Sequence, residues 1–115
     1  MKRERMDKMG VYKTVIIDSE EVLDDFTNQA KYILYFSSEK CSVCNDILPQ
    51  LERITDDLPI QIGKIDVNKN LKIAGQYLIF VTPTILIFND EKEILRESRF
   101  IDFKKIERML DLLIQ

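Results

Sequence analysis

The chain of 115 residues is 45% hydrophobic, which is enough for one domain to bury its own core without structural disulfides or a metal. Its 17 basic and 20 acidic residues give a net charge of -3, and this argues against a nucleic-acid-binding surface, because such surfaces concentrate Lys and Arg. No apolar run approaches the roughly 20 residues that span a bilayer, so we expect neither nucleic acid nor a membrane as a partner.

The N-terminus carries no secretory pattern. Residues 1–9 mix basic and acidic side chains, and no uninterrupted apolar run follows them, although a secretory signal requires one. We therefore expect a cytoplasmic protein. Residues 1–10 form an N-terminal extension to which we assign no function, and residues 11–115 form the domain.

The first half of the chain predicts two strands, each followed by a helix. Residues 11–17 are rich in β-branched side chains and lead to Ser19, a helix N-cap residue followed by acidic and apolar side chains. Residues 32–36 are continuously apolar and aromatic, as in a strand covered on both faces. Residues 42–58 repeat apolar side chains at helical spacing, with Pro49 expected to kink the helix.

The second half predicts a strand, a short helix, a hairpin and a last helix. The predicted strands are residues 60–67, 84–88 and 94–98, and the predicted helices are residues 71–77 and an amphipathic stretch from 101 to 113 that Asp102 can cap. The element order is then βαβαβαββα. Such an order indicates an α/β fold whose sheet has a parallel part and an antiparallel hairpin.

Cys41 and Cys44 are the two cysteines of the chain, and they lie where a predicted strand leads into a predicted helix. A helix N-terminus lowers a thiol pKa, because unpaired N–H groups and the positive end of the helix dipole face the sulfur. Cys41 is therefore the predicted nucleophile. Cys44 follows about one helical turn later and can close a disulfide on Cys41, which makes it the predicted resolving thiol.

Other uses of the cysteine pair are weaker. The two residues can be small buried hydrophobes at a helix start. A zinc or iron–sulfur site usually needs four ligands, whereas this chain has 2 Cys and no His. We therefore expect no metal and no bound cofactor. The short spacing also makes a poor structural staple, which favours catalytic dithiol chemistry.

Three motifs resemble the thioredoxin family over nearly the whole chain. Residues 41–44 read Cys-Ser-Val-Cys and begin five residues after Phe36, Pro49 follows the second cysteine by five residues, and residues 81–84 read Val-Thr-Pro-Thr. The resemblance implies a thioredoxin fold, with a central mixed sheet and helices on both faces. It also implies a cis peptide bond before Pro83, in a loop beside the active-site disulfide, although a proline at a strand start is an alternative.

The same resemblance implies a substrate groove. Ser42 and Val43 between the cysteines, and Thr82 and Pro83 in the loop, are the predicted substrate-binding residues. With a cis bond, the Thr82 backbone would face the groove beside Cys41 and pair with an extended substrate strand.

The chain also departs from the family pattern. Lys40 stands where thioredoxins have a tryptophan, and Ser42-Val43 replaces Gly-Pro. Tyr35 aligns with a buried aspartate that helps proton transfer at the second cysteine, and we align Ile62 with its lysine partner. Because a positioned base typically contributes about 10²–10⁴-fold, resolution by Cys44 is expected to be slow. No histidine lies between the cysteines, so we expect a reductant or an exchange catalyst.

The favoured function is a thiol–disulfide oxidoreductase that exchanges disulfides with protein or small thiol substrates. A separate reductase or a low-molecular-weight thiol would supply the electrons. One alternative is a thioredoxin-fold binding module with little redox turnover, suggested by the missing base. A third and weaker possibility is a peroxide-responsive role, in which Cys41 forms a sulfenic acid.

Overall fold

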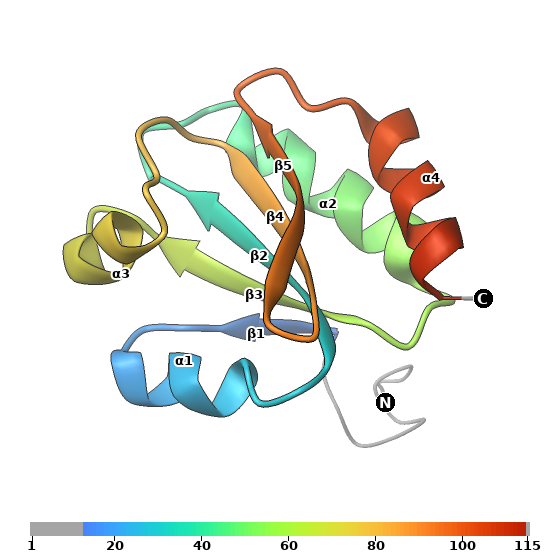
Figure 1. Ribbon diagram of the computed structural model, residues 1–115. Coiled ribbons are helices and arrows are strands. Elements are labelled where there is room, and N and C mark those ends of the chain that lie inside the picture. The colour runs from blue at the N-terminus through green and yellow to red at the C-terminus, as the bar shows by residue number, and fades with distance from the viewer. Residues whose placement is uncertain (1–12, 115) are drawn as a thin grey trace, which may run out of the picture.

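Parallel and antiparallel strand pairs join into one five-stranded sheet in the order β1-β3-β2-β4-β5 (Figure 1). The computed structural model describes residues 13–114, so the predicted extension at residues 1–10 lies outside the described residues. The strands are β1 (Thr14–Ile16), β2 (Lys31–Ser37), β3 (Gln61–Asp66), β4 (Thr84–Asn89) and β5 (Lys92–Ser98). The helices are α1 (Glu20–Phe26), α2 (Cys44–Thr55), α3 (Leu71–Gln76) and α4 (Phe103–Leu113). This is the predicted order and the predicted mixed α/β fold.

The helices cover both faces of the sheet, as Figure 1 shows. Helices α2 and α4 pack on one face, against alternate residues of the central strands such as Ile33, Tyr35 and Ile85. Helices α1 and α3 pack on the other, against Leu34, Phe36 and further residues of the alternate set. Successive side chains of a strand point to opposite faces, and helices cover both faces here. Strand β2 is therefore buried along nearly its whole length, as its apolar run predicts.

Local signals set several helix ends. The Ser19 hydroxyl accepts a hydrogen bond from the Val22 N–H at 3.1 Å, and the Asp102 carboxylate accepts one from the Lys105 N–H at 3.1 Å. These contacts are the N-caps of α1 and α4, and both caps are confirmed. No helix within residues 13–114 has the length and apolar character needed to cross a membrane.

The boundaries of α2, β5 and β1 differ from the predicted ones, and several others shift by one or two residues. Helix α2 ends at Thr55, because Pro59 disfavours helical backbone at Leu58 and the Lys13 ammonium binds the Thr55 and Leu58 carbonyls at 2.7 Å each. Strand β5 begins earlier than predicted, since only Asp90 and Glu91, both at positive φ, form the turn. Within the described residues, β1 is shorter than the predicted strand.

Candidate active site

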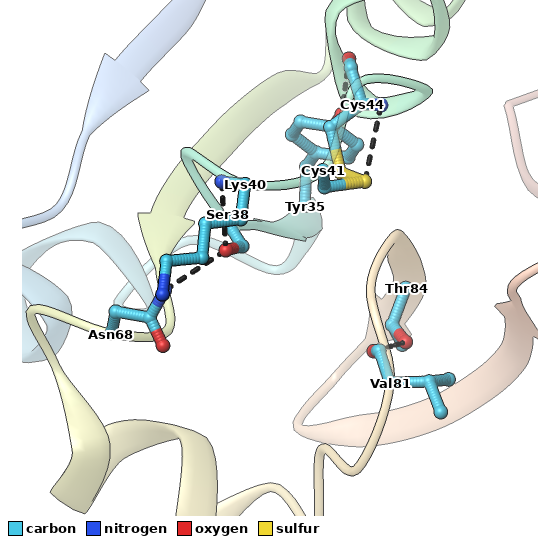
Figure 2. The surroundings of a disulfide bond; sticks show 8 residues. All are labelled: Tyr35, Ser38, Lys40, Cys41, Cys44, Asn68, Val81 and Thr84. Atoms are coloured by element: carbon cyan, nitrogen blue, oxygen red, sulfur yellow. Dashed lines mark hydrogen bonds between the residues drawn. A yellow bond between two sulfur atoms is a disulfide. The ribbon is translucent and has the colours of Figure 1, made fainter.

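The cysteine pair lies in the connection from β2 to α2 (Figure 2). Cys41 and Cys44 form a disulfide, with 5.4 Å between their Cα atoms. The helix begins only at Cys44, so Ser42 and Val43 form a turn ahead of it, whereas the sequence predicted them as its first residues. Residues 13–114 contain no cluster of three His, Cys, Asp or Glu side chains that could hold a metal ion.

The two sulfurs differ in their surroundings. The Cys44 N–H, the first of α2, donates to the Cys41 Sγ at 3.2 Å (Figure 2). The same N–H also donates to the Cys41 carbonyl at 3.2 Å, and its position at the N-terminus of α2 lets it stabilise a thiolate on Cys41. Cys44 is buried, with 4% of its surface exposed, whereas Cys41 is only partly buried. An incoming disulfide can therefore reach Cys41 and not Cys44.

The loop before β4 lies at the same end of the sheet. The peptide bond between Thr82 and Pro83 is cis, as the resemblance implies. Thr84 pairs with Phe36 across β4 and β2, which brings this loop beside the start of the cysteine loop. The Arg99 N–H donates to the Pro83 carbonyl at 2.8 Å. Among the described residues, neither the N–H nor the C=O of Thr82 has a hydrogen-bond partner.

Tyr35 lies behind the disulfide, in the core between β2 and α2. Its hydroxyl donates to the Cys44 carbonyl at 2.6 Å, and its side chain is fully buried. Burial raises the pKa of Tyr35 to about 12, so the phenol keeps its proton at neutral pH and cannot accept one from Cys44. The side chain therefore fixes the first turn of α2. The sequence indicated a core tyrosine, but not this hydrogen bond.

Lys64, rather than Ile62, is the β3 residue beside Tyr35. The parallel register pairs Tyr35 with Lys64 and Ile33 with Ile62, so our alignment of Ile62 with the family's lysine position is wrong by two residues. The error keeps the same face of the strand, because side chains alternate with a period of two. A cation is thus present next to Tyr35, on the strand that also carries Asp66.

A cleft of about 600 Å³ opens beside Cys44, at the end of the sheet where β2 leads into the cysteine loop. Its walls include Tyr35, Lys64 and Asp66, together with Pro49 from the helix. Pro49 lies inside α2 as predicted. Because the cleft reaches Cys44, water in it can take up the proton that the buried thiol must lose before it acts as a nucleophile.

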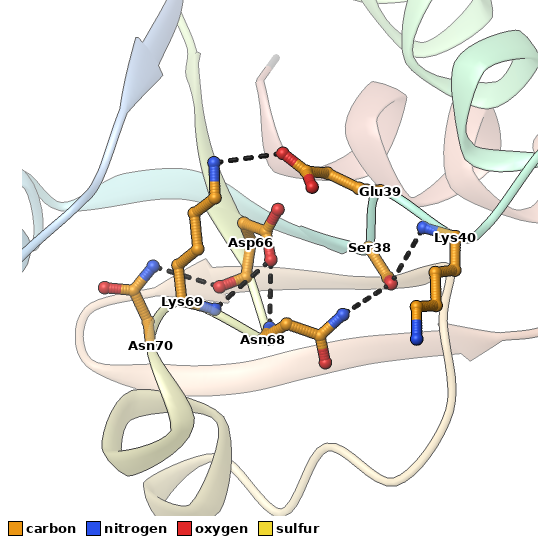
Figure 3. Close-up of polar contacts among 7 residues, drawn as sticks. All are labelled: Ser38, Glu39, Lys40, Asp66, Asn68, Lys69 and Asn70. Atoms are coloured by element: carbon orange, nitrogen blue, oxygen red, sulfur yellow. Dashed lines mark hydrogen bonds and ion pairs between the residues drawn. The ribbon is translucent and has the colours of Figure 1, made fainter.

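Hydrogen bonds tie the cysteine loop to the segment after β3 (Figure 3). The Ser38 hydroxyl accepts from the Lys40 N–H at 3.2 Å and from the Asn68 side chain at 2.9 Å. The Glu39 carboxylate pairs with the Lys69 ammonium at 3.0 Å. This pair is exposed and therefore weak, but it partly offsets the negative charge of Glu39, which lies two residues before Cys41.

Residues 13–111 match the family model named thioredoxin. The chain belongs to the thioredoxin family. This thioredoxin-family protein is 37% identical over 90 residues to the thioredoxin-like protein YdfQ of Bacillus subtilis (strain 168), with 76% of this chain and 80% of the relative covered. It is 35% identical over 100 residues to a thioredoxin of Chlamydia pneumoniae, with 86% and 95% covered.

Solved structures support the fold of this thioredoxin-family protein. A mutant thioredoxin from Halobacterium salinarum NRC-1 superposes with a TM-score of 0.80 at 20% identity, covering 90% of this chain and 92% of the other. Oxidised thioredoxin O2 from Arabidopsis thaliana gives a TM-score of 0.78 at 16% identity, covering 90% and 96%. Family membership and the cysteine pair at disulfide distance make the protein a thiol–disulfide oxidoreductase, as predicted from the sequence.

Proposed function

We propose that the protein reduces disulfides in other polypeptides through Cys41 as nucleophile and Cys44 as resolving thiol. The observation that carries this assignment is the contrast between the sulfurs. Cys41 is partly exposed and receives the Cys44 N–H, whereas Cys44 is buried behind it. A thiolate needs both stabilisation and access to attack a substrate, and Cys41 has both.

The reaction proceeds in two exchanges. The Cys41 thiolate attacks one sulfur of the substrate disulfide, the substrate S–S bond breaks, and the other substrate sulfur leaves as a thiolate. Cys44 then loses its proton to water and attacks Cys41, which releases the second substrate thiolate and forms the Cys41–Cys44 disulfide. Two electrons pass from the protein to the substrate. A low-molecular-weight thiol or a separate reductase restores the dithiol.

The substrate segment lies in our proposal between the cysteine loop and the loop before β4. Ser42 and Val43 contact it on one side, and Thr82 and Pro83 on the other. The absence of hydrogen-bond partners for the Thr82 backbone among residues 13–114 supports this placement, since an extended peptide can bind such groups by strand addition. We place the reaction in the cytoplasm, where a reducing environment favours the dithiol that donates electrons.

Reduction of a disulfide-bearing polypeptide by the thiol-reduced protein tests the assignment. Wild type should show turnover and Cys41→Ser none. Cys44→Ser should accumulate a mixed disulfide between Cys41 and the substrate, visible as an added mass that a reductant removes. Equilibration of the wild type in thiol/disulfide buffers should give a two-electron couple at roughly -200 to -270 mV.

Two results would contradict this assignment. If turnover stays at background and is insensitive to Cys41→Ser, the protein is a thioredoxin-fold binding module. If Cys44→Ser turns over like wild type and traps no adduct, Cys44 is not the resolving thiol.

A further inference from the structure

Large apolar side chains lie exposed on the segments that surround Cys41. Val43, between the cysteines, is 51% exposed. Phe80, two residues before Thr82, is 85% exposed, and Phe100, in the loop between β5 and α4, is 83% exposed. Aromatic side chains are costly to leave in water and are enriched at the buried centre of interfaces. We therefore expect these side chains to contact the substrate that Cys41 attacks.

The loop that carries Phe100 is fixed to the loop before β4. The Arg99 N–H bonds the Pro83 carbonyl at 2.8 Å, and the Phe100 N–H bonds the Ser98 carbonyl at 2.7 Å. Arg99 adopts φ 65°, a left-handed conformation that non-glycine residues adopt at a conformational cost and that often marks functional sites. These contacts hold Arg99 and Phe100 beside Thr82 and Pro83.

Two cations lie on the segments of this face without an ion-pair partner in the described part of the chain. Lys40 adjoins Cys41 and Arg99 adjoins Pro83, and neither forms an ion pair within residues 13–114. Two acidic groups beside these cations are paired, since Glu39 binds Lys69 and Glu97 binds Lys105 at 3.5 Å. Although the chain has a net charge of -3, these two cations thus lie on the segments that carry the exposed apolar side chains.

We propose that this face selects disulfide-bearing polypeptide segments that carry an acidic side chain and a large apolar side chain close to the cysteine. The acidic group binds between Lys40 and Arg99, and the apolar group packs on Phe100. The selection rests on the proposed function, because the same Cys41 attacks the segment. The partner of this face is an extended peptide rather than a second copy of the chain, because the N–H and C=O of Thr82 can form hydrogen bonds with an added strand.

Synthetic peptide disulfides test the selection. Four peptides share one intrapeptide disulfide and differ beside the cysteine: two carry Leu with Asp or with Lys, and two carry Ser with Asp or with Lys. We expect kcat/KM for the Leu–Asp peptide to exceed that for the Leu–Lys peptide by about tenfold at low salt, within the range of electrostatic steering. The ratio should fall towards one as the ionic strength is raised.

Variants assign the preference to residues. The Lys40→Gln, Arg99→Gln double variant should reduce the Asp-over-Lys ratio to about one to two, whereas Lys92→Gln, at the start of β5, should keep the wild-type ratio. Phe100→Ser should reduce the Leu-over-Ser ratio by about fivefold, whereas Leu112→Ser, which removes another exposed apolar side chain, should not. Because each ratio compares two peptides on one variant, a change in Cys41 reactivity cancels.

Reduction of hydroxyethyl disulfide, a small uncharged disulfide, separates the two proposals. If wild type reduces neither this compound nor any peptide, the proposed function fails. If it reduces the small disulfide but all four peptides at equal rates, or prefers Lys, the selection is overturned and the function stands. A dimer in sedimentation velocity that Phe100→Ser dissociates would also overturn it, since the face would then bind a second copy.

Discussion

Tyr35 donates its hydroxyl hydrogen to the Cys44 carbonyl from inside the core, so the residue behind the proposed resolving cysteine holds the helix instead of accepting a proton. Burial raises its pKa to about 12, far above neutral pH. In our proposal, resolution therefore uses water or another side chain in the cleft that Cys44 and Lys64 line. This arrangement explains in physical terms why the second exchange is expected to be slow.

Tyr35→Phe should destabilise the protein and leave its fold unchanged. The substitution leaves the buried Cys44 carbonyl without the Tyr35 hydrogen bond, which costs about 1–2 kcal/mol in the free energy of unfolding. Urea unfolding followed by circular dichroism measures the loss. Tyr32→Phe is the matched control, because Tyr32 lies on the opposite face of β2 and its hydroxyl has no hydrogen-bond partner among residues 13–114. Equal losses in the two variants would contradict a special role for the Tyr35 hydroxyl.

At the scale of residues, the sequence predicted which residues form the candidate site but did not predict the contacts among them. The cysteine spacing and the Thr-Pro pair were sufficient to find the site. The Tyr35 hydrogen bond depends on the gap between β2 and α2, and the pairing of Tyr35 with Lys64 depends on strand register. Neither quantity is visible in a run of apolar residues.

At the scale of the elements, Gly63 of β3 lies where a side chain would collide with Ile17 and with Phe26 of α1. A Cβ atom at this position would lie 2.5 Å from the Ile17 Cδ1 and 2.8 Å from the Phe26 Cε2. Both neighbours belong to the buried cluster between the sheet and α1. Because Gly63 has no side chain, α1 can pack closely on β3.

Gly63→Ala should lower the free energy of unfolding by about 1–3 kcal/mol, because the added methyl overpacks a buried contact. Gly75→Ala is the control, since a Cβ there meets no atom within 4 Å and alanine favours a helix over glycine by about 1 kcal/mol. Urea midpoints at unchanged m-value compare the two variants. An equally stable Gly63→Ala would show that Ile17 and Phe26 move aside at little cost.

Local capping signals predicted the N-caps of α1 and α4, whereas the end of α2 was not predicted. Ser19 and Asp102 act through the third residue after them, so the signal is local in the chain. The end of α2 also depends on the Lys13 ammonium, whose contacts with the Thr55 and Leu58 carbonyls span more than forty residues. A long-range contact of this kind leaves no periodic pattern.

At the scale of the whole molecule, the stability of the fold should decrease at alkaline pH. Burial, with smaller contributions from Tyr77 and Glu91, raises the pKa of Tyr32 from 10.0 to about 12, and burial alone raises that of Tyr35 to about 12. The folded protein therefore holds these protons more tightly than the unfolded chain. The resulting stability is fully present below about pH 10 and is lost as the pH rises towards about 12.

Urea unfolding between about pH 8 and about pH 11.5 should show the free energy of unfolding falling above about pH 10. The Tyr32→Phe, Tyr35→Phe double variant should start from a lower value and lose less over the same interval, because neither phenol remains to ionise. Parallel curves for wild type and double variant would assign the alkaline loss to other groups.

The element order was predictable because each element has its own period, but strand order is a property of the complete molecule. The pairing of β2 with β4 places Thr84 beside Phe36 and so joins two loops about forty residues apart. The family resemblance supplied that juxtaposition in advance. Residue patterns alone support only an α/β sheet with a hairpin.

Strand β5 forms one border of the sheet, and within the described residues it pairs only with β4. A bare border strand invites the same strand of another molecule, which is a common start of aggregation. Here the strand alternates in sign, with Lys92, Glu93, Arg96 and Glu97 along its length, and Arg96 is bound to Glu93 at 2.7 Å. Charged side chains on a border strand disfavour such pairing, because it would remove water from them, so concentrated solutions should stay free of fibrils.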